Sequence, residues 1–357
     1  MIRFCGAALL AVWVSGGVAA AANLGFLNHE HPVLDAHNCY PYDGRWSGRL
    51  RRALDSGFPV SIEQDLAWYV DPGSGKGRVV VAHTPRPTGR EPTLRAYFFE
   101  QVRPIMEKAL AENRRSEWPL IILHFDFKDT RPAILEAVWQ LLGEYEPWLS
   151  TAAKTADPLQ LSPIDRKPIL VVTEDSDAQA KVFYDEVPVG GRLRLFGSAH
   201  TRSPPPGATL AQRAHWEATA TPAQLLKTRA TDYRRWWNNS WWLVEEGGET
   251  HAGAWTKADE RRLRALVDYA HEQGYWIRFY TLDGFGRNRD RGWDESYNFG
   301  SMRRVIPRWR AAIAAGVDFI ATDQYRTLSR YLDQRDRALR PGGTQVAGGR
   351  DDVPGGT

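Results

Sequence analysis

Cysteine is scarce in this 357-residue chain, which contains only Cys5 and Cys39. Cys5 lies within the first 22 residues, and a lone remaining thiol can form no internal disulfide. A small scaffold held together by disulfides is therefore excluded, and the fold must be stabilised by its hydrophobic core.

The chain also has little net charge of either sign. Its 46 Lys and Arg residues nearly balance 43 Asp and Glu residues, which gives a net charge of +3 and a pI near 8.8. Nucleic-acid-binding domains usually concentrate their basic residues on one face, whereas the Arg residues here are scattered. We therefore expect no nucleic-acid partner, and only a mild attraction to anionic substrates.

Long hydrophobic runs are lacking after residue 22. The first 22 residues contain Arg3, the apolar run Ala7 to Val14 and the small residues Gly17 to Ala22, an order typical of a cleaved signal peptide. The alternative is an uncleaved anchor, but the run is shorter than the roughly 20 residues that a membrane span needs. We expect residues 1–22 to be removed and the protein to be secreted or periplasmic.

What the chain does contain is globular material, with 43% hydrophobic and 25% charged residues. Eight short β-rich runs alternate with helical stretches, and they are Val33 to Asn38, Val60 to Asp65, Leu120 to Lys128, Ile169 to Glu174, Leu193 to Gly197, Trp241 to Glu245, Trp276 to Leu282 and Phe319 to Asp323. The apolar spacing predicts helices over Arg49 to Asp55, Leu94 to Asn113, Pro132 to Tyr145, Lys257 to Gln273 and Met302 to Ala315.

This alternation predicts an α/β fold, specifically a TIM-type (β/α)8 barrel that forms a single domain over residues 23–334. An open, doubly wound sheet is the alternative, because the closure of a sheet cannot be read from a sequence. Residues 197–239 do not follow the repeat, and we interpret them as a long loop over one end of the barrel. The Gly-rich residues 335–357 should form a disordered tail.

Two carboxylates stand at alternate positions of the second predicted strand, as Glu63 and Asp65. Alternate residues of a strand project from the same face, so the two like charges should lie side by side. A divalent cation between them relieves their repulsion, and Ca²⁺ or Mg²⁺ prefers carboxylate oxygens. The alternative is ordinary polar alternation on a solvated face.

The third predicted strand places His124, Asp126 and Lys128 on one face and apolar residues on the other. Burying a carboxylate, an ammonium and an imidazole together is costly unless they pair or bind a ligand, so this face is a candidate site. The alternative is a structural ion pair between Asp126 and Lys128.

His37 and His83 each follow a short apolar run, at the carboxyl end of a predicted strand, where barrels carry their active sites. Two imidazoles can act as base and acid on a phosphodiester. In the seventh strand, Trp276, Arg278 and Tyr280 share a face, so Arg278 can clamp a phosphate and Tyr280 can line a head-group pocket. The alternative is a cation stacked on core aromatics.

The ordered set of motifs resembles the phospholipase-C-like phosphodiesterase superfamily, on the residues His37-Asn38, Glu63-x-Asp65, His83, Asp126-x-Lys128 and Gly316 to Asp323. That superfamily unites glycerophosphodiester phosphodiesterases, phosphatidylinositol-specific phospholipases C and sphingomyelinases D. Within it, the chain is most similar to the branch related to altered inheritance of mitochondria protein 6.

The resemblance implies a role for each matching residue. It makes Glu63, Asp65 and Asp126 metal ligands and gives acid and base work to His37 and His83. Asn38 matches a further metal ligand of calcium-dependent phospholipases. The Asp126-x-Lys128 spacing instead resembles sphingomyelinase D, and Asn38-Cys39 replaces the Arg-Gly of glycerophosphodiesterases.

We therefore expect a hydrolase that uses one divalent cation, Ca²⁺ or Mg²⁺, on a phospholipid or glycerophosphodiester-type substrate. His37 is the expected base and His83 the expected acid, while Lys128, Arg278, Tyr280 and His124 are the expected substrate-binding residues. A monomer with peripheral contact to a membrane surface is expected. The alternatives are a barrel glycosidase that uses Glu63 and Glu174, and an inactive Trp-rich binding protein of the cell envelope.

Overall fold

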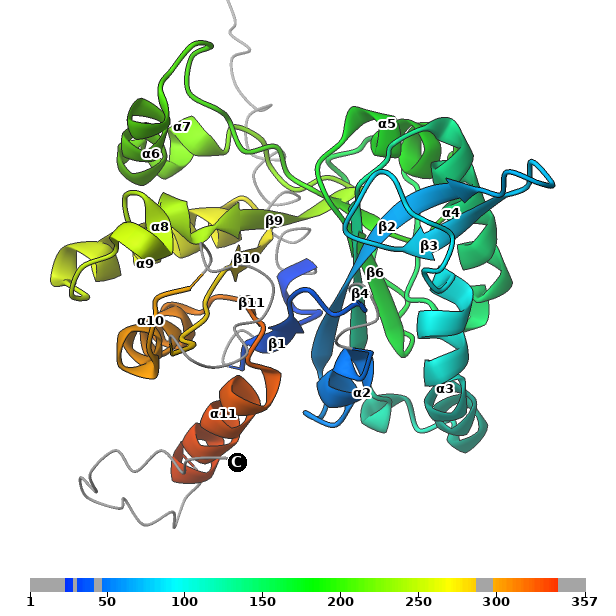
Figure 1. The fold of residues 1–357 in the computed structure, drawn as a ribbon, viewed down its shortest axis with the longest axis horizontal. Helices are drawn as coiled ribbons and strands as arrows, with labels where there is room; N and C mark the ends of the chain where they lie inside the picture. The colour runs from blue at the N-terminus through cyan, green and yellow to red at the C-terminus, as the bar shows by residue number, and fades with distance from the viewer. Residues whose placement is uncertain (1–22, 28–30, 42–46, 287–297, 340–357) are drawn as a thin grey trace, which may run out of the picture.

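The computed structural model describes residues 23–27, 31–41, 47–286 and 298–339, and a barrel of parallel strands forms its centre (Figure 1). Within these ranges, eight parallel strands form the ring, and they are β1 (Val33–Ala36), β2 (Val60–Val70), β4 (Ile121–Phe127), β6 (Ile169–Thr173), β8 (Phe196–Ser198), β9 (Arg234–Ser240), β10 (Trp276–Tyr280) and β11 (Phe319–Thr322).

Strand β1 closes the ring, because it pairs with β2 on one side and β11 on the other. Leu34 lies opposite Val60 of β2 and Ile320 of β11, and both pairings are parallel. The predicted (β/α)8 barrel is therefore confirmed, and the open, doubly wound alternative is wrong.

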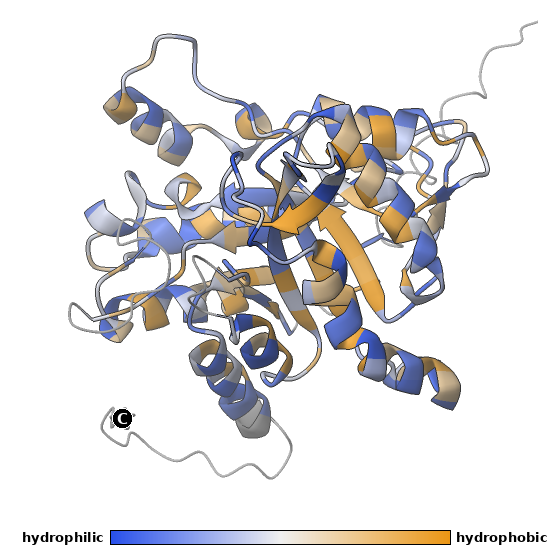
Figure 2. Cartoon of the chain, turned by 45° about the vertical axis from the view of Figure 1, so that its right-hand side comes forward, coloured by the Kyte–Doolittle hydropathy of each residue, from blue (hydrophilic) through white to orange (hydrophobic). Residues whose placement is uncertain are grey.

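Helices surround the barrel and turn their apolar faces toward it (Figure 2). They include α2 (Arg49–Leu54), α3 (Glu100–Glu112), α4 (Pro132–Glu144), α9 (Lys257–Glu272), α10 (Met302–Ala315) and α11 (Tyr325–Leu339). Helix α9 begins where Thr256 and Asp259 form a reciprocal capping box, and Gly274, with a φ of 84°, follows its last turn. Leu263, Leu266 and Val267 are buried on its inner stripe, as their spacing predicts.

The barrel interior changes from apolar to polar along the strands. Near the amino ends, the buried side chains form a cluster that includes Val33, Ile122, Val172, Phe196, Trp236, Trp276 and Phe319. Two positions further along, the buried residues are Asp35, His124 and Arg278, with Asn238 beside them. Polar chemistry is therefore concentrated toward the carboxyl ends of the strands.

The predictions of the sixth strand and of the long loop before it are wrong. Residues 241–243 form a 3₁₀ turn, and the strand at this place in the ring is β9, in the segment that we expected to be a loop. The rest of that segment holds the short helices α6 (Leu210–Thr219) and α7 (Pro222–Leu225). The charged start of β9 obscured the pattern, yet Arg235 is buried because it pairs with Asp232 at 3.2 Å and donates to the Ser162 carbonyl at 2.9 Å.

Strand β2 extends beyond the barrel and forms a hairpin with the antiparallel strand β3 (Gly77–Val81). Leu66 lies opposite Val81, so the chain after β3 returns toward Asp65. His83 therefore follows a hairpin strand outside the ring, and not a barrel strand as we expected. The remaining elements are short: β5 (Ala152–Ala153), β7 (Arg192–Leu193), α5 (Asp177–Ala180) and α8 (Gly248–His251).

The ends of the chain test the predicted boundaries only in part. Helix α11 continues to Leu339, so residues 335–339 are helical and do not belong to a tail. The predicted signal peptide, residues 1–22, and residues 340–357 lie outside the described residues. Within the described ranges, no helix combines the length and apolar character that a membrane span requires.

Candidate active site and metal centre

Three carboxylates from two neighbouring strands converge at the carboxyl end of the barrel. Glu63 and Asp65 lie on β2, and Asp126 lies opposite Asp65 on β4. One oxygen from each of the three carboxylates lies within 4.8 Å of the others. The structure thus brings together three of the four residues that the sequence analysis assigned to a metal, and the fourth is Asn38.

The chemistry of this carboxylate trio fits a divalent cation. Asp65 is 1% exposed, and among the described residues its Oδ1 has no hydrogen-bond partner. Burial, and then the charge of Asp126, raises the pKa of Asp65 well above its usual value. Buried carboxylate oxygens without hydrogen bonds are ready ligands for a hard cation such as Ca²⁺ or Mg²⁺.

Lys128 supplies positive charge at the edge of the trio. Its Nζ lies 2.7 Å from Asp126 Oδ2 and 3.0 Å from Asp65 Oδ2. Its backbone amide donates to the Leu66 carbonyl at 2.8 Å, which fixes the root of the side chain. Burial opposes its charge, but Asp65 and Asp126 raise the pKa of Lys128 above its usual value. The ammonium is therefore charged at every physiological pH.

His37 lies on the Glu63 side of the trio. Its Nδ1 is 3.0 Å from Asp323 Oδ1, and its Nε2 is 3.8 Å from Glu63 Oε2. Burial disfavours its charged form, but Glu63 and Asp323 outweigh burial and raise the pKa of His37 to about 9. Asp323 is held in turn by Arg49 at 3.1 Å. A proton on Nδ1 directed at Asp323 leaves Nε2 facing the carboxylates.

Asn38 and Tyr280 lie next to His37. Asn38 has a φ of 54°, its amide donates to Asp323 Oδ1 at 3.0 Å, and its Oδ1 accepts a hydrogen bond from Tyr40 at 2.6 Å. That oxygen has only its second lone pair for a metal, and the assignment of Asn38 as a ligand stays a prediction. The ring of Tyr280 stacks on His37 with centroids 6.1 Å apart, as a residue that lines the site would.

His83 lies on the Asp65 side of the trio, across from His37. Its Nε2 is 3.7 Å from Asp65 Oδ2, and its ring stacks on Tyr40 with centroids 6.0 Å apart. Its side chain is 35% exposed. Burial and the charge of Lys128 lower the pKa of His83, so its neutral form is favoured. The two imidazoles thus flank the carboxylates and have opposite pKa shifts.

Arg278 lies in the floor of the site and not at its surface, which corrects the prediction that it clamps phosphate. It is 1% exposed, and its guanidinium contacts Asp35, Glu63 at 2.9 Å and Asn238 at 2.9 Å. All three of its nitrogens already donate to protein groups. Arg278 therefore positions Glu63 and compensates the buried charge beneath the trio.

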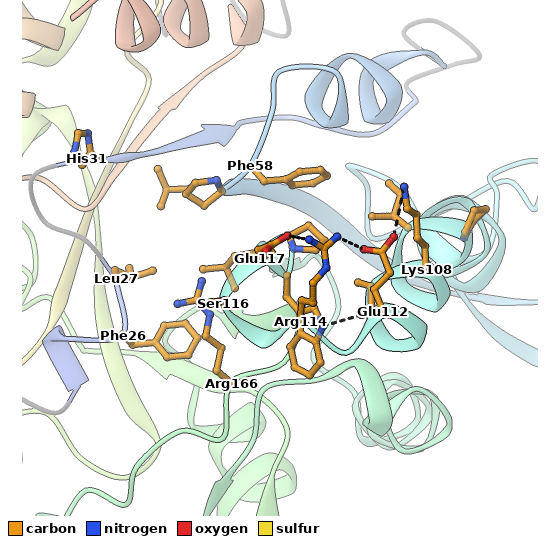
Figure 3. A pocket seen from close by; sticks show the side chains of 18 of the residues that line it. Phe26, Leu27, His31, Phe58, Lys108, Glu112, Arg114, Ser116, Glu117 and Arg166 are labelled. Carbon is orange, nitrogen blue, oxygen red and sulfur yellow. Dashed lines mark hydrogen bonds and ion pairs between the residues drawn. The ribbon is translucent and has the colours of Figure 1, made fainter. Parts of the chain in front are cut away.

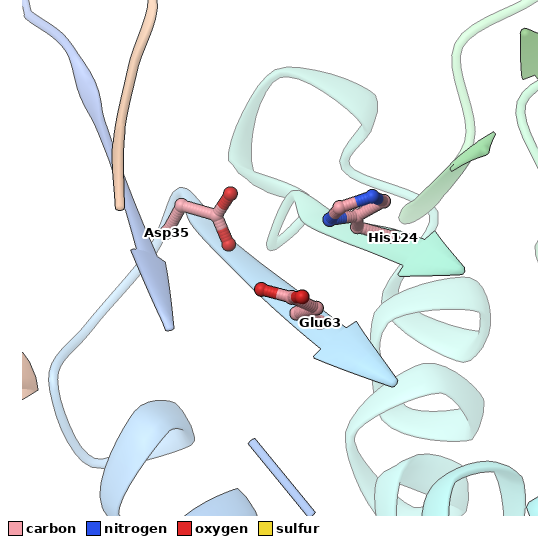
Figure 4. A group of neighbouring side chains, drawn as sticks. All are labelled: Asp35, Glu63 and His124. Carbon is pink, nitrogen blue, oxygen red and sulfur yellow. The ribbon is translucent and has the colours of Figure 1, made fainter. Parts of the chain in front are cut away.

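His124 is also part of the floor, so the prediction that it binds substrate needs the same correction. It is fully buried, and its Nε2 lies 2.7 Å from Glu174 Oε1. Asp35, Glu63 and His124 point toward one another from three strands (Figure 4). Because His124 precedes Asp126 by two residues on β4, its side chain lies one layer deeper in the barrel.

The sequence analysis missed a second acidic wall beside His37. Asp283 follows β10 and accepts hydrogen bonds from the Thr322 hydroxyl at 2.5 Å and the Asp323 amide at 2.7 Å. Burial, and then the charge of Asp323, raises the pKa of Asp283 to about 7. Glu249 of α8 contacts the Thr281 hydroxyl. The position of Asp283 after a barrel strand was a signal for it, but no signal pointed to Glu249.

A large hollow among the described residues lies at the opposite end of the barrel, near the starts of β1, β2 and β4. It has a volume of 1270 Å³, with Phe26, Leu27 and Trp118 in its lining. Several of its charged residues pair with one another, as Arg114 does with Glu117 (Figure 3). It contains no cluster of potential metal ligands, so the carboxylate trio is the stronger candidate for the active site.

Comparisons with known proteins give only a distant likeness. No family model matches the chain, and no curated protein does. A glycerophosphodiester phosphodiesterase from Parabacteroides distasonis superposes over 85% of this chain and 98% of its own, at 11% identity and a TM-score of 0.39. A Plasmodium falciparum HPPK-DHPS superposes over 88% of this chain, at 11% identity and a TM-score of 0.40. The chain spans about half the length of that protein, with 48% covered. Such values carry no functional argument, which must come from the site itself.

Proposed function

We propose that this protein is a divalent-cation-dependent phosphoric diester hydrolase. The observation that carries the proposal is the pair of histidines that flanks the carboxylate trio, with His37 beside Glu63 and His83 beside Asp65. Phosphodiester cleavage needs charge compensation on the phosphoryl oxygens together with proton transfer to and from the reacting oxygens. A phospholipid or a glycerophosphodiester is the proposed substrate, in keeping with the superfamily resemblance.

The trio of Glu63, Asp65 and Asp126 would hold the cation, which when bound would offset the negative charge of the phosphodiester. Lys128 attracts the same phosphate, because its side chain is 20% exposed and its ammonium lies at the rim of the trio. Arg278 keeps Glu63 ionised from below, since together with His37 it outweighs the burial that would raise the pKa of Glu63.

His37 and His83 share the proton transfers. The contact with Asp323 orients the ring of His37, while His83 reaches the site from the hairpin. Without a bound cation, the pKa directions favour a proton on His37 and none on His83, the reverse of what base His37 and acid His83 need. Offsetting the charge of Glu63 lowers the pKa of His37 toward neutrality. The assignment of base and acid therefore remains a prediction.

Two observations weigh against the alternative functions. A glycosidase needs a carboxylic acid with a raised pKa, whereas the pKa values of Glu63 and Glu174 are both lowered. The two carboxyls are instead bonded to Arg278 and to His124. A Trp-rich binding surface needs exposed indoles, whereas Trp236, Trp237 and Trp241 are buried in the barrel and its helical layer.

A panel of chromogenic substrates tests the proposal. The protein is incubated with p-nitrophenyl phosphodiesters and p-nitrophenyl glycosides, with EDTA or with added Ca²⁺ or Mg²⁺. We expect release of p-nitrophenol from a phosphodiester only, abolished by EDTA and restored by metal. Turnover of a glycoside, or no turnover of any diester with either metal, would contradict the proposal.

Export of the mature protein belongs to the same proposal, since the first 22 residues have the order of a signal peptide. Amino-terminal sequencing of protein recovered from the periplasm or medium should begin just after Ala20 or Ala22. Recovery of the chain from membranes with Met1 intact would instead assign it to the anchored class.

A further inference from the structure

The position of Lys128 bears on how the site takes up its metal. The Lys128 ammonium contacts Oδ2 of both Asp65 and Asp126, two of the three carboxylates that would hold the cation. It is thus the counter-ion of these two groups, and its backbone amide is anchored at the end of β4 by a hydrogen bond to the Leu66 carbonyl.

A cation on the same carboxylates must share them with this ammonium. Asp65 is 1% exposed, so charges around it are poorly screened by solvent. Its Oδ1 has no hydrogen-bond partner within the described residues, so the ion pair with Lys128 is its main compensation. Two positive charges that contact the same buried carboxylate repel each other strongly. The one that binds the carboxylate more tightly therefore weakens the binding of the other.

We propose that Lys128 and the divalent cation compete for Asp65 and Asp126, so that metal binding releases the ammonium toward the substrate phosphate. This inference rests on the proposed function, because it takes the carboxylate trio as the metal site. The inference adds an order of events. The metal first binds the carboxylates, and Lys128 then becomes free to bind an anion. A ligand can approach Lys128, since its side chain is 20% exposed.

The competition predicts that a mutation next to the metal site increases the affinity for metal, which is unusual. Removing Lys128 should strengthen metal binding, whereas a Lys128 that buttresses the ligands would weaken it when removed. Titration calorimetry with MgCl₂ and CaCl₂ on the full chain compares the parent, Lys128→Met and the control Lys108→Met. Lys108 is an exposed lysine of α3 that lies 3.8 Å from its partner Glu112. It lines the hollow at the end of the barrel opposite the trio.

We expect Lys128→Met to bind metal at least about tenfold more tightly than the parent, since a unit charge close to a divalent cation is strongly repelled at low dielectric. Lys108→Met should bind as the parent does. Equal or weaker binding by Lys128→Met would overturn the inference. If that variant does not fold without metal, Lys128→Gln, which retains a hydrogen-bond donor, takes its place in the same titration.

The outcomes separate this inference from the proposed function. Metal binding by the parent without a gain in Lys128→Met overturns the competition and leaves the metal-dependent hydrolase standing. Binding by Lys128→Met alone supports the competition and contradicts metal use by the parent. Binding by neither overturns both.

Discussion

Replacing Glu249 by Gln should stabilise the protein above neutral pH, and this tests the electrostatics of the acidic wall beside His37. Glu249 is 1% exposed on α8 and contacts the hydroxyl of Thr281, a β-branched residue with a φ of 72°. Positive φ is costly for such a residue and persists only where its surroundings impose it. Burial, with a contribution from Asp283, raises the pKa of Glu249 from 4.5 to about 8.

The magnitude of the effect follows from linkage between protonation and folding. Between pH 4.5 and 8 the native state binds more protons at Glu249 than the unfolded state does. Stability therefore falls as the pH rises through this window, at up to about 1.4 kcal/mol for each pH unit. At pH 7.5 the accumulated cost is roughly 3 to 4 kcal/mol. Gln is neutral at every pH and removes that cost while it retains the contact with Thr281.

Urea denaturation followed by Trp fluorescence measures this at pH 5 and pH 7.5. Glu249→Gln should be more stable than the parent by about 2 kcal/mol or more at pH 7.5, with a small difference at pH 5. The control Glu246→Gln changes an exposed neighbour and should not alter the pH dependence. Equal pH dependence of the parent and Glu249→Gln would refute the reasoning.

Further predictions concern the trio, the histidines and the floor. Asp65→Asn should abolish the rise in melting temperature that Mg²⁺ or Ca²⁺ gives the parent, as scanning calorimetry will show. His37→Asn and His83→Gln should each lower kcat/KM about 10²-fold or more, and a p-nitrophenol leaving group should rescue only the variant that lacks the acid, expected to be His83→Gln. Arg278→Met leaves Asp35 and Glu63 without their buried cation, so chemical denaturation should show a loss of about 3–5 kcal/mol.

Alternation along strands predicted which site residues share a face. Glu63 and Asp65, and likewise Asp126 and Lys128, do lie on one side of their strands, because strand geometry is local and has a period of two. Alternation does not give depth, however. His124 and Arg278 share the inward face but lie deeper in the barrel than Asp126, where His124 contacts Glu174 and Arg278 contacts Glu63. Their predicted contact with substrate failed for that reason.

The features that the sequence pattern did not predict depend on contacts with other parts of the chain. Strand β9 begins with charged residues, and the burial of Arg235 depends on the carbonyl of Ser162, 73 residues away, so no local apolar pattern marks the strand. The pairing of Asp323 with His37 joins residues 286 positions apart. Glu249 comes from a four-residue helix whose place at the site depends on how the chain after β9 packs.

The central claim is that the carboxylate trio binds a divalent cation that phosphodiester hydrolysis requires. It is tested most directly by following the turnover of bis(p-nitrophenyl) phosphate by the parent and by Asp65→Asn, first in EDTA and then with excess Mg²⁺ or Ca²⁺. The account predicts no turnover by the parent in EDTA, recovery on addition of metal, and no recovery in Asp65→Asn. Undiminished turnover in EDTA, or full recovery in Asp65→Asn, would contradict it.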